Sequence, residues 1–445
     1  MSKLKVLYVA HNHPSVRPGG AEEHALEVHR AMRNVDGMES VLLAKGGPPV
    51  GAIGSLHLGT YISPVGATAD EYFLYTDGYD FDYINLTITD KDFYTKHFRE
   101  FLRAIAPDVV HFQHTHFLGY DLIREVHNTI PNAPIIYTLH EYLPICARDG
   151  QMIRVGTNEL CDGATPRKCH GCFPNVSAQN FFLRKRLIQS QLALVDVFLA
   201  PSRFLMQRYI EWGIPEEKIR FEDYGREPGS PLPDEPRASR NRLGFFGQFS
   251  GYKGVDVLMQ AMRLIGNDVG SAGTPAADSR GARPNLVLHG ANLDLQDGQF
   301  QNLFGRLLEE TRDNVTLLGR YDRKQLPALM AGVDWVIVPS IWWENSPLVI
   351  QEAFMYQRPV ICSDIGGMAE KVTDGVNGLH FKVGDPVSLA RVIERAVASP
   401  TLWDELRRGI PPVYTLDAQV LKLKRIYESL VADRRVNRRD RVSAN

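Results

Sequence analysis

Two carboxylates, Glu344 and Glu352, flank the predicted start of an apolar helix in the stretch S-I-W-W-E-N-S-P-L-V-I-Q-E-A-F. Trp335–Pro339, just before it, is typical of a buried strand. Ser346 and Pro347 suit a helix N-cap and first helical position, where free N–H groups favour an anion. Glu352, inside an apolar helix, needs donors such as sugar hydroxyls. Taken alone, however, the pair is better explained by a surface Glu344 and an arginine partner for Glu352.

Two loops with glycines follow predicted strands and precede predicted helices. Gly19-Gly20 follows the first strand, and the segment Gly247–Gly254 follows the first strand of the second half. Glycines let backbone N–H groups approach a phosphate at a helix N-terminus. Lys253 can hold a diphosphate as a point charge. The alternatives are ordinary turn glycines and a solvated lysine.

Several histidines lie where predicted strands end. His140 follows a strand and can donate to a sugar hydroxyl or shift protons near neutral pH. A hydrogen-bonded structural histidine is the usual alternative. His111, His114 and His116 crowd the end of the preceding strand, but their spacing does not require a metal.

Four cysteines form the pattern C-x14-C-x7-C-x2-C: Cys146, Cys161, Cys169 and Cys172. Four thiolates in one loop-rich segment suit a tetrahedral structural zinc. The alternatives are four unlinked thiols, disulfides if the chain is exported, and an iron–sulfur cluster. Cys362 lies in an apolar run and is expected in the core.

Short apolar runs alternate with helical patterns along the whole chain, which predicts parallel sheets covered on both faces. The predicted strands are Lys5–Ala10, Ser40–Ala44, Asp108–Phe112, Pro134–Leu139, Asp196–Pro201, Arg242–Gly247, Asn285–Gly290, Asn314–Gly319, Trp335–Pro339 and Pro359–Ser363. The predicted helices are Ala21–Arg33, Lys91–Ile105, Phe181–Leu194, Val255–Leu264, Leu303–Arg312, Lys324–Met330, Pro347–Tyr356 and Pro386–Ala398.

A stretch rich in proline and glycine divides the chain into two doubly wound domains. We predict a first domain over 1–225 with a cysteine-rich insert at 146–172, a linker at 226–240, a second domain over 241–410, a helix over 411–432 and a polar tail at 433–445. Ligands bind beyond the carboxyl ends of the strands, so a cleft between two facing sheets is the natural site.

Composition excludes several classes of protein. The chain has 445 residues, 44% of them hydrophobic, and a net charge of -2, which gives no general attraction to nucleic acid. No apolar run is long enough to cross a bilayer, and the N-terminus lacks a signal-peptide pattern. We expect a cytoplasmic protein. Basic and apolar residues in Phe181–Leu194 allow contact with the inner face of an anionic membrane, although a solvated face is the commoner explanation.

The order of these motifs resembles the retaining nucleotide-sugar glycosyltransferases of the GT-B fold, specifically glycosyltransferase family 4, of the type called glycosyl transferases group 1. The resemblance covers nearly the whole chain, and its motifs are Gly19-Gly20, His140, G-x5-K-G at Gly247–Gly254, E-x7-E at Glu344–Glu352, S-D-I-G-G-M-A-E at Ser363–Glu370 and D-G-V-N-G at Asp374–Gly378. It implies a GT-B fold, with two Rossmann-like domains facing across a deep cleft and the C-terminal helix packed on the first domain.

The resemblance also implies roles for the matching residues. Those expected at the reacting centre are His140, Glu344 and Lys253, with Glu344 on the donor sugar and Lys253 on the diphosphate. The other donor-binding residues implied are Gly19, Gly20, Gln248, Arg320, Tyr321, Asn345, Ser346, Pro347, Leu348 and Glu352, the last on the ribose. His114 and His116 are expected on the acceptor side.

The implied activity is transfer of a sugar from a UDP- or GDP-sugar to a hydroxyl of a carbohydrate or lipid-linked acceptor, in polysaccharide or glycoconjugate biosynthesis. No catalytic metal is implied. The family usually has arginine where this chain has Gln248, and a neutral amide supplies no charge to the diphosphate. The alternatives are a sugar phosphorylase or epimerase of the same fold, and a zinc-organised nucleotide-sugar-binding protein without transfer activity.

Overall fold

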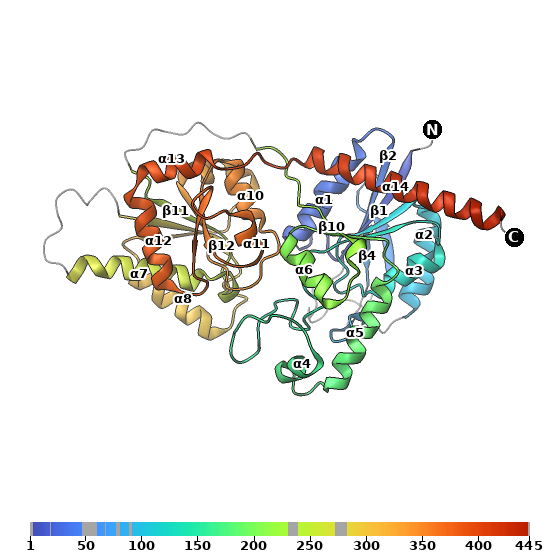
Figure 1. Ribbon diagram of the computed structural model, residues 1–445, viewed down its shortest axis with the longest axis horizontal. Coiled ribbons are helices and arrows are strands. Elements are labelled where there is room, and N and C mark those ends of the chain that lie inside the picture. The colour runs from blue at the N-terminus through green and yellow to red at the C-terminus, as the bar shows by residue number, and fades with distance from the viewer. Residues whose placement is uncertain are drawn as a thin grey trace. The chain divides into compact units, whose positions relative to one another are not determined.

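The computed structural model describes residues 3–17, 19–46, 60–66, 68–76, 81–88, 91–229, 239–271 and 283–443. The chain forms two compact units, one made of Met1–Gly225 with Tyr414–Asn445 and the other of Arg226–Val413. Each unit is an open, mainly parallel sheet with helices packed against it (Figure 1). The predicted α/β class with two doubly wound domains is therefore confirmed.

Within the described residues, the first unit contains an eight-stranded sheet in the order β10-β9-β8-β7-β1-β2-β4-β3. The pairs are parallel except at the edge, where β3 runs antiparallel to β4. Strand order reverses between β1 and β7, and ligands of such sheets bind at that point. The strands are β1 Leu4–Ala10, β2 Met38–Lys45, β3 Tyr61–Pro64, β4 Glu71–Tyr75, β7 Val109–Phe112, β8 Ile135–Thr138, β9 Val197–Ala200 and β10 Ile219–Phe221, beside a separate ribbon of β5 Phe81–Asp82 and β6 Thr87–Ile88.

The first unit also contains helices, several of which pack against this sheet. They are α1 Gly20–Arg33, η1 Phe93–Phe98, α2 Arg99–Ile105, α3 Asp121–Thr129, α4 Pro166–Cys172, α5 Ala178–Leu192, α6 Arg203–Trp212 and η2 Glu216–Lys218. The stretch predicted to be helical, Lys91–Ile105, is helical throughout, although its central part, η1, is π-helical. Ser177 and Ser202 cap α5 and α6, since each side chain accepts a hydrogen bond from the first helical turn.

The second unit contains, within its described residues, a six-stranded parallel sheet in the order β13-β12-β11-β14-β15-β16. Numbered within the unit, this is the 3-2-1-4-5-6 order of dinucleotide-binding folds, and it reverses between β11 and β14. The strands are β11 Arg242–Gln248, β12 Asn285–Ala291, β13 Val315–Gly319, β14 Trp335–Val338, β15 Val360–Ser363 and β16 Gly378–Phe381.

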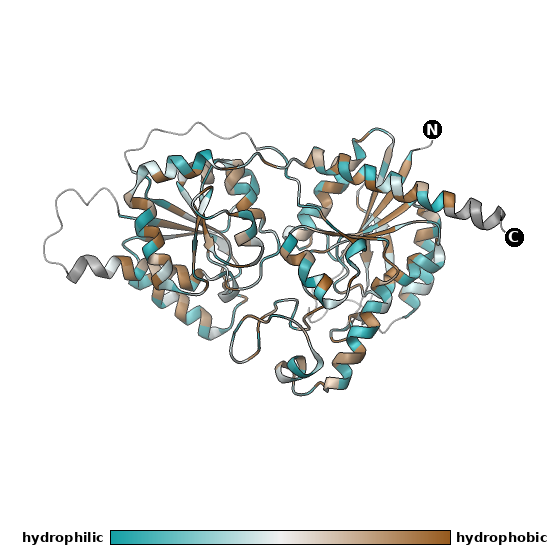
Figure 2. Ribbon diagram, in the orientation of Figure 1, coloured by the Kyte–Doolittle hydropathy of each residue, from teal (hydrophilic) through white to brown (hydrophobic). Residues whose placement is uncertain are grey.

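Helices of the second unit pack on the apolar strands, which are the brown core of the unit in Figure 2. They are η3 Gly251–Lys253, α7 Val255–Ser271, α8 Gly298–Glu310, η5 Arg323–Gln325, α9 Leu326–Gly332, α10 Leu348–Met355, α11 Gly366–Lys371, α12 Pro386–Ala398 and α13 Pro400–Arg408. The α12 boundary follows its sequence closely: Asp385 accepts from two backbone N–H groups and Pro386 occupies the first turn. Cys362 is fully buried in this core, as expected.

The last helix, α14 Leu416–Ser443, packs on the first unit beside α1 (Figure 1). Leu416, Val420, Leu423 and Tyr427 recur at helical spacing and join the core around β1 and β2. The helix continues to Ser443, so the prediction of a polar tail from 433 is wrong over those residues. Most of the predicted linker, residues 230–238, lies outside the described residues. In the described part of the chain, no helix has the length and apolar character needed to cross a membrane.

Candidate functional site

Two loops of the second unit meet where its strand order reverses. One follows β11 and contains η3, and the other follows β14. The Ile341 N–H donates to the Tyr252 carbonyl at 3.0 Å and ties the loops together. Gly254 has φ of +66°, and a Cβ there would lie 1.9 Å from the Pro339 carbonyl oxygen. The glycine is therefore required for Lys253 to lie against the end of β14.

Glu344 and Lys253 form an ion pair between these loops, in which the carboxylate is buried and the lysine is partly exposed. Glu344 is 5% exposed, and its Oε1 accepts from Lys253 Nζ at 2.6 Å, Ser340 Oγ at 2.8 Å and Trp342 Nε1 at 2.9 Å. Burial raises the pKa of Glu344, but the charge and hydrogen bond of Lys253, together with the hydrogen bonds of Ser340 and Trp342, outweigh it, so the pKa lies below its usual value. All three of these donors reach Oε1, and no described residue donates to Oε2, which can accept from a ligand.

Glu352 on α10 is held by arginine. Its Oε1 accepts from Arg226 Nη2 at 2.8 Å, and Arg323 Nη2 lies 3.7 Å away. The Arg226 side chain is only 2% exposed. The arginine alternative considered for Glu352 is therefore the arrangement observed. Sequence reasoning missed Arg226, because it begins the segment assigned to the linker.

The predicted cap of α10 is wrong by one residue. The helix begins at Leu348 with Pro347 as the N-cap, and no side chain caps it. Pro347 has an extended ψ of 117°, while its carbonyl already accepts from the Ile350 N–H. Ser346 is buried, and its N–H donates to Asn345 Oδ1 at 2.7 Å. The loop from Glu344 to Pro347 therefore leads directly into the helix that carries Glu352.

The other residues of this unit that are predicted to bind the nucleotide-sugar differ in how far they are buried. The Tyr321 ring lies edge-on to Phe246 and His289, with centroids 5.9 and 5.8 Å away. Burial and the nearby charge of Glu352 raise the pKa of Tyr321. Arg320 and Gln248 are exposed. A nucleobase contact by Arg320 and Tyr321 remains a prediction.

His140 lies just beyond β8 in the first unit and is almost fully buried. Its Nε2 donates to Gln113 Oε1 at 3.0 Å, and its Nδ1 accepts from the Tyr224 hydroxyl at 2.7 Å. Burial, followed by nearby His24 and His114, lowers the pKa of His140 well below its usual value. The imidazole is therefore neutral, with both nitrogens engaged in the first unit. Gln113 and Tyr224 were not singled out in the sequence.

His114 and His116 lie in a polar cluster at the strand-order reversal of the first unit. The rings of His11 and His114 have centroids 4.1 Å apart, and His114 Nε2 lies 3.2 Å from Glu141 Oε1. His11 Nε2 lies 2.9 Å from Glu22 Oε1. Sequence reasoning missed His11, Glu22 and Glu141 as members of this cluster.

Gly19 and Gly20 open α1 beside the same cluster. Gly19 is the N-cap of the helix, and Gly20 is its first residue. A Cβ at Gly19 would lie 2.4 Å from Glu22 Oε2. The glycine thus makes room for the carboxylate that pairs with His11.

The four clustered cysteines line one small cavity of about 30 Å³ beside α4. All four are reduced and partly buried. Among the described residues, however, no group of three or more histidine, cysteine or acidic side chains is arranged to hold a metal ion. The thiols share a cavity but do not form a finished zinc site, so zinc remains a prediction from the sequence.

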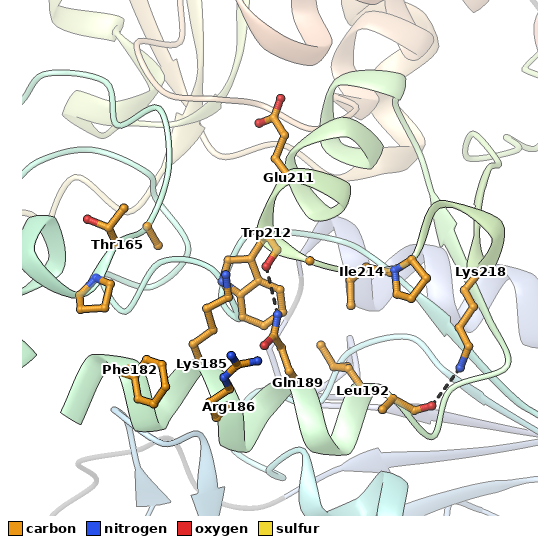
Figure 3. A pocket seen from close by; sticks show the side chains of 15 residues that line it. Thr165, Phe182, Lys185, Arg186, Gln189, Leu192, Glu211, Trp212, Ile214 and Lys218 are labelled. Carbon is orange, nitrogen blue, oxygen red and sulfur yellow. Dashed lines mark hydrogen bonds between the residues drawn. The ribbon is translucent and has the colours of Figure 1, made fainter. Parts of the chain in front are cut away.

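A larger cavity, of about 690 Å³, lies between α5 and α6 at the edge of the sheet where β9 and β10 begin (Figure 3). Lys185 lies over the Trp212 ring, and Gln189 donates to the Trp212 carbonyl. The predicted site residues lie at the opposite, carboxyl end of the strands. Arg184, expected on a basic face, is buried and donates to three backbone carbonyls. Arg184 is therefore available neither to a membrane surface nor to solvent, whereas contact of the remaining residues of this helix with a membrane stays a hypothesis.

Comparison with known proteins matches both halves of the chain. Residues 234–410 match the family Glycosyl transferases group 1, and residues 18–221 match Glycosyltransferase Family 4. A glycogen synthase from Halorhodospira halophila is 27% identical over 206 residues, which cover 43% of this chain and 38% of that protein. The matched region thus spans well under half the length of this curated relative.

Solved structures share the fold across the whole chain. Sucrose-phosphate synthase from Thermosynechococcus elongatus gives a TM-score of 0.69 at 16% identity, over 96% of this chain and 100% of that chain. HepE from Anabaena, solved with UDP and glucose, gives 0.61 at 17% identity, also over 96% and 100%. The two sheet orders and the two family matches together identify a glycosyltransferase of the GT-B fold, whose second half matches the group 1 family.

Proposed function

We propose that this chain transfers a sugar from a UDP- or GDP-sugar to an acceptor hydroxyl and retains the configuration of the anomeric carbon. The observation that carries the proposal is the ion pair of the buried Glu344 with Lys253 at the strand-order reversal of the second unit. A carboxylate that is fixed by hydrogen bonds to one oxygen can accept a hydrogen bond from a sugar hydroxyl at the other oxygen. The cation beside it can bind phosphate.

In this proposal different residues contact the sugar, the diphosphate and the ribose of the nucleotide-sugar. Lys253 shares its charge between Glu344 and the diphosphate, and the backbone of Asn345–Leu348 lies near the sugar and phosphate. Glu352, positioned by Arg226, accepts from the ribose hydroxyls. The Glu352–Arg226 contact fixes the carboxylate before the nucleotide binds, which lowers the entropy cost of binding.

The transfer step breaks the bond between the anomeric carbon and the diphosphate oxygen, whose electron pair leaves with the diphosphate. The acceptor oxygen bonds to the anomeric carbon on the same face, and its proton passes to the departing phosphate oxygen. Lys253 stabilises the negative charge that develops on the diphosphate. No protein nucleophile is assigned a covalent role.

The acceptor is proposed to be a carbohydrate or a lipid-linked sugar in polysaccharide or glycoconjugate biosynthesis. The matched glycogen synthase is named for building a polysaccharide, which supports this class of acceptor. HepE, whose structure is described with UDP and glucose, supports a UDP-sugar as the first donor to test.

A thermal-shift screen against UDP-, GDP- and ADP-sugars tests the proposal, followed by measurement of nucleoside diphosphate release. We expect one nucleotide class to raise the melting temperature and to be hydrolysed slowly in water. Glu344→Gln should lower that rate by about 100-fold or more, whereas the exposed control Glu394→Gln should not. Stabilisation without release would indicate a binding protein, and no stabilisation by any nucleotide would refute the proposal. The anomeric configuration of the transfer product, read by NMR, decides retention.

A further inference from the structure

Lys45 is a buried cation for which the described residues provide no counter-charge. It ends β2, next to β1, and is only 5% exposed. Within the part of the chain that the structure describes, its Nζ forms no hydrogen bond or ion pair, and its contact is with the Phe117 ring, 5.3 Å from the centroid. Burial, with a smaller effect of Arg17, lowers the pKa of Lys45 to about 8. A buried charge without a partner is costly, so this position calls for an anion.

Two histidines beside Lys45 also have unused polar atoms. His116 stacks on Phe117 with centroids 3.8 Å apart, and its buried Nε2 has no hydrogen-bond partner among the described residues. The same holds for Nδ1 of His11. Burial, with a smaller effect of neighbouring charges that include Lys45 and Arg17, holds the pKa of His116 near 2. Burial also lowers the pKa of His11, to about 4, so both imidazoles are neutral hydrogen-bonding groups.

The acidic groups of the cluster are occupied elsewhere. Glu22 pairs with His11, and Glu141 pairs with His114. The charged group that affects the pKa of Lys45 is Arg17, which is also positive and lies on the exposed loop after β1. The end of β2 is therefore locally cationic in a chain of net charge -2.

We propose that the acceptor carries a phosphate or diphosphate, which binds Lys45 at the carboxyl end of β2. Arg17 faces the same anion from the loop, and His11 and His116 supply hydrogen bonds to the acceptor. Lysine is a common phosphate ligand in proteins. The inference rests on the proposed function, because it gives the acceptor its chemical class, but its test needs no transfer activity.

The test uses inorganic pyrophosphate in a full-length Lys253→Met background, where the proposed donor cation is removed. We expect pyrophosphate to raise the melting temperature of this protein, and Lys45→Met in the same background to weaken binding by about tenfold or more. The exposed Lys96→Met should bind like the background protein. Equal pyrophosphate binding with and without Lys45, or no binding to the background protein, would overturn the inference.

The stability of Lys45→Met without any anion gives a second measurement. Removing a buried unpaired charge should leave the melting temperature unchanged or higher in anion-free buffer. A lower melting temperature would mean that Lys45 already has a structural partner, and would count against the inference. Pyrophosphate binding and the melting temperature of Lys45→Met do not depend on sugar transfer. They therefore test the Lys45 site even if the proposed transfer activity is not found.

Farnesyl diphosphate and glucose 1-phosphate distinguish the two sources of such an anion. Lys45-dependent binding of farnesyl diphosphate that is stronger than binding of pyrophosphate would support a lipid-linked acceptor. Stronger Lys45-dependent binding of glucose 1-phosphate would support a soluble sugar phosphate. A preference for either ligand that persists in Lys45→Met would overturn the assignment to this site.

Discussion

Lys253 Nζ lies 2.6 Å from Glu344 Oε1, although the two residues are 91 positions apart in the chain. The contact joins the loop after the first strand of the second unit to the loop after its fourth. Lys253 helps to keep the buried carboxylate of Glu344 ionised, so removing the lysine leaves that charge without its partner.

Lys253→Met should therefore lower stability most at neutral pH. The pKa of Glu344 is held below its usual value, so the pair contributes stability above the unfolded pKa and loses it as pH falls through the folded pKa. Without Lys253, only the hydrogen bonds of Ser340 and Trp342 would oppose the effect of burial on that pKa. We expect a loss of about 1–2 kcal/mol at pH 7, discounted because Lys253 is partly exposed, and a smaller loss at pH 4.

Urea unfolding of the parent and of Lys253→Met between pH 4 and pH 7 measures this difference. The exposed Lys324→Met is the matched control and should follow the parent at each pH. A difference between parent and Lys253→Met that does not grow with rising pH would contradict the assignment of the pair.

Glu352→Gln should reduce the preference for ribose over deoxyribose. The carboxylate is positioned by Arg226 and in our proposal accepts from two ribose hydroxyls. Charge-assisted hydrogen bonds are stronger than neutral ones, so the parent should bind the nucleoside diphosphate about tenfold more tightly than its 2′-deoxy form. Calorimetry with both nucleotides measures the ratio in each protein. The control Glu394→Gln should keep the ratio of the parent. If Glu352→Gln also keeps it, Glu352 does not bind the ribose.

Gly254→Ala should destabilise the second unit by about 1–3 kcal/mol, because the residue has a positive φ and its Cβ would meet the Pro339 carbonyl. Gly305→Ala is the natural control. Gly305 lies within α8 with open space where a Cβ would be added, so alanine should stabilise that helix by about 0.5–1 kcal/mol. Thermal unfolding measures both. Equal effects of the two substitutions would contradict the close approach at Gly254.

The cysteine pattern predicts one zinc ion per chain, bound by thiolates around the cavity beside α4. Elemental analysis of purified protein should then find about one zinc per chain, and a chelator should lower the melting temperature. Cys169→Ser should lose the metal, whereas Cys362→Ser, in the core of the second unit, should keep it. A metal content near zero would leave four free thiols as the correct interpretation.

Most strands of both sheets, although not β3, β4 and β10, could be predicted because continuous apolar runs such as Trp335–Val338 are buried on both faces. Strand β16 was missed because Gly378 and His380 interrupt its apolar run; the His380 imidazole bonds the Val372 carbonyl. Helix α13 was missed because only Trp403 and Leu406 are buried, too few to show a helical period.

The site residues were predictable as motifs, but their partners were not. Arg226 and Glu352 are 126 positions apart, and nothing in the local sequence of either one indicates the other. Gln113 and Tyr224 hold His140 through contacts between separate strand ends. Such pairs follow from strand order, which local periodicity does not determine.

The return of α14 to the first unit has a consequence during synthesis on the ribosome. Tyr427 is fully buried there, and its hydroxyl bonds Tyr8 at 3.0 Å and His111 at 2.7 Å. The second unit is therefore an insertion between two parts of the first, and the nascent first unit remains incomplete until the final helix has emerged. Domains generally fold as units during translation, so the second unit can reach its native state earlier although its sequence begins later.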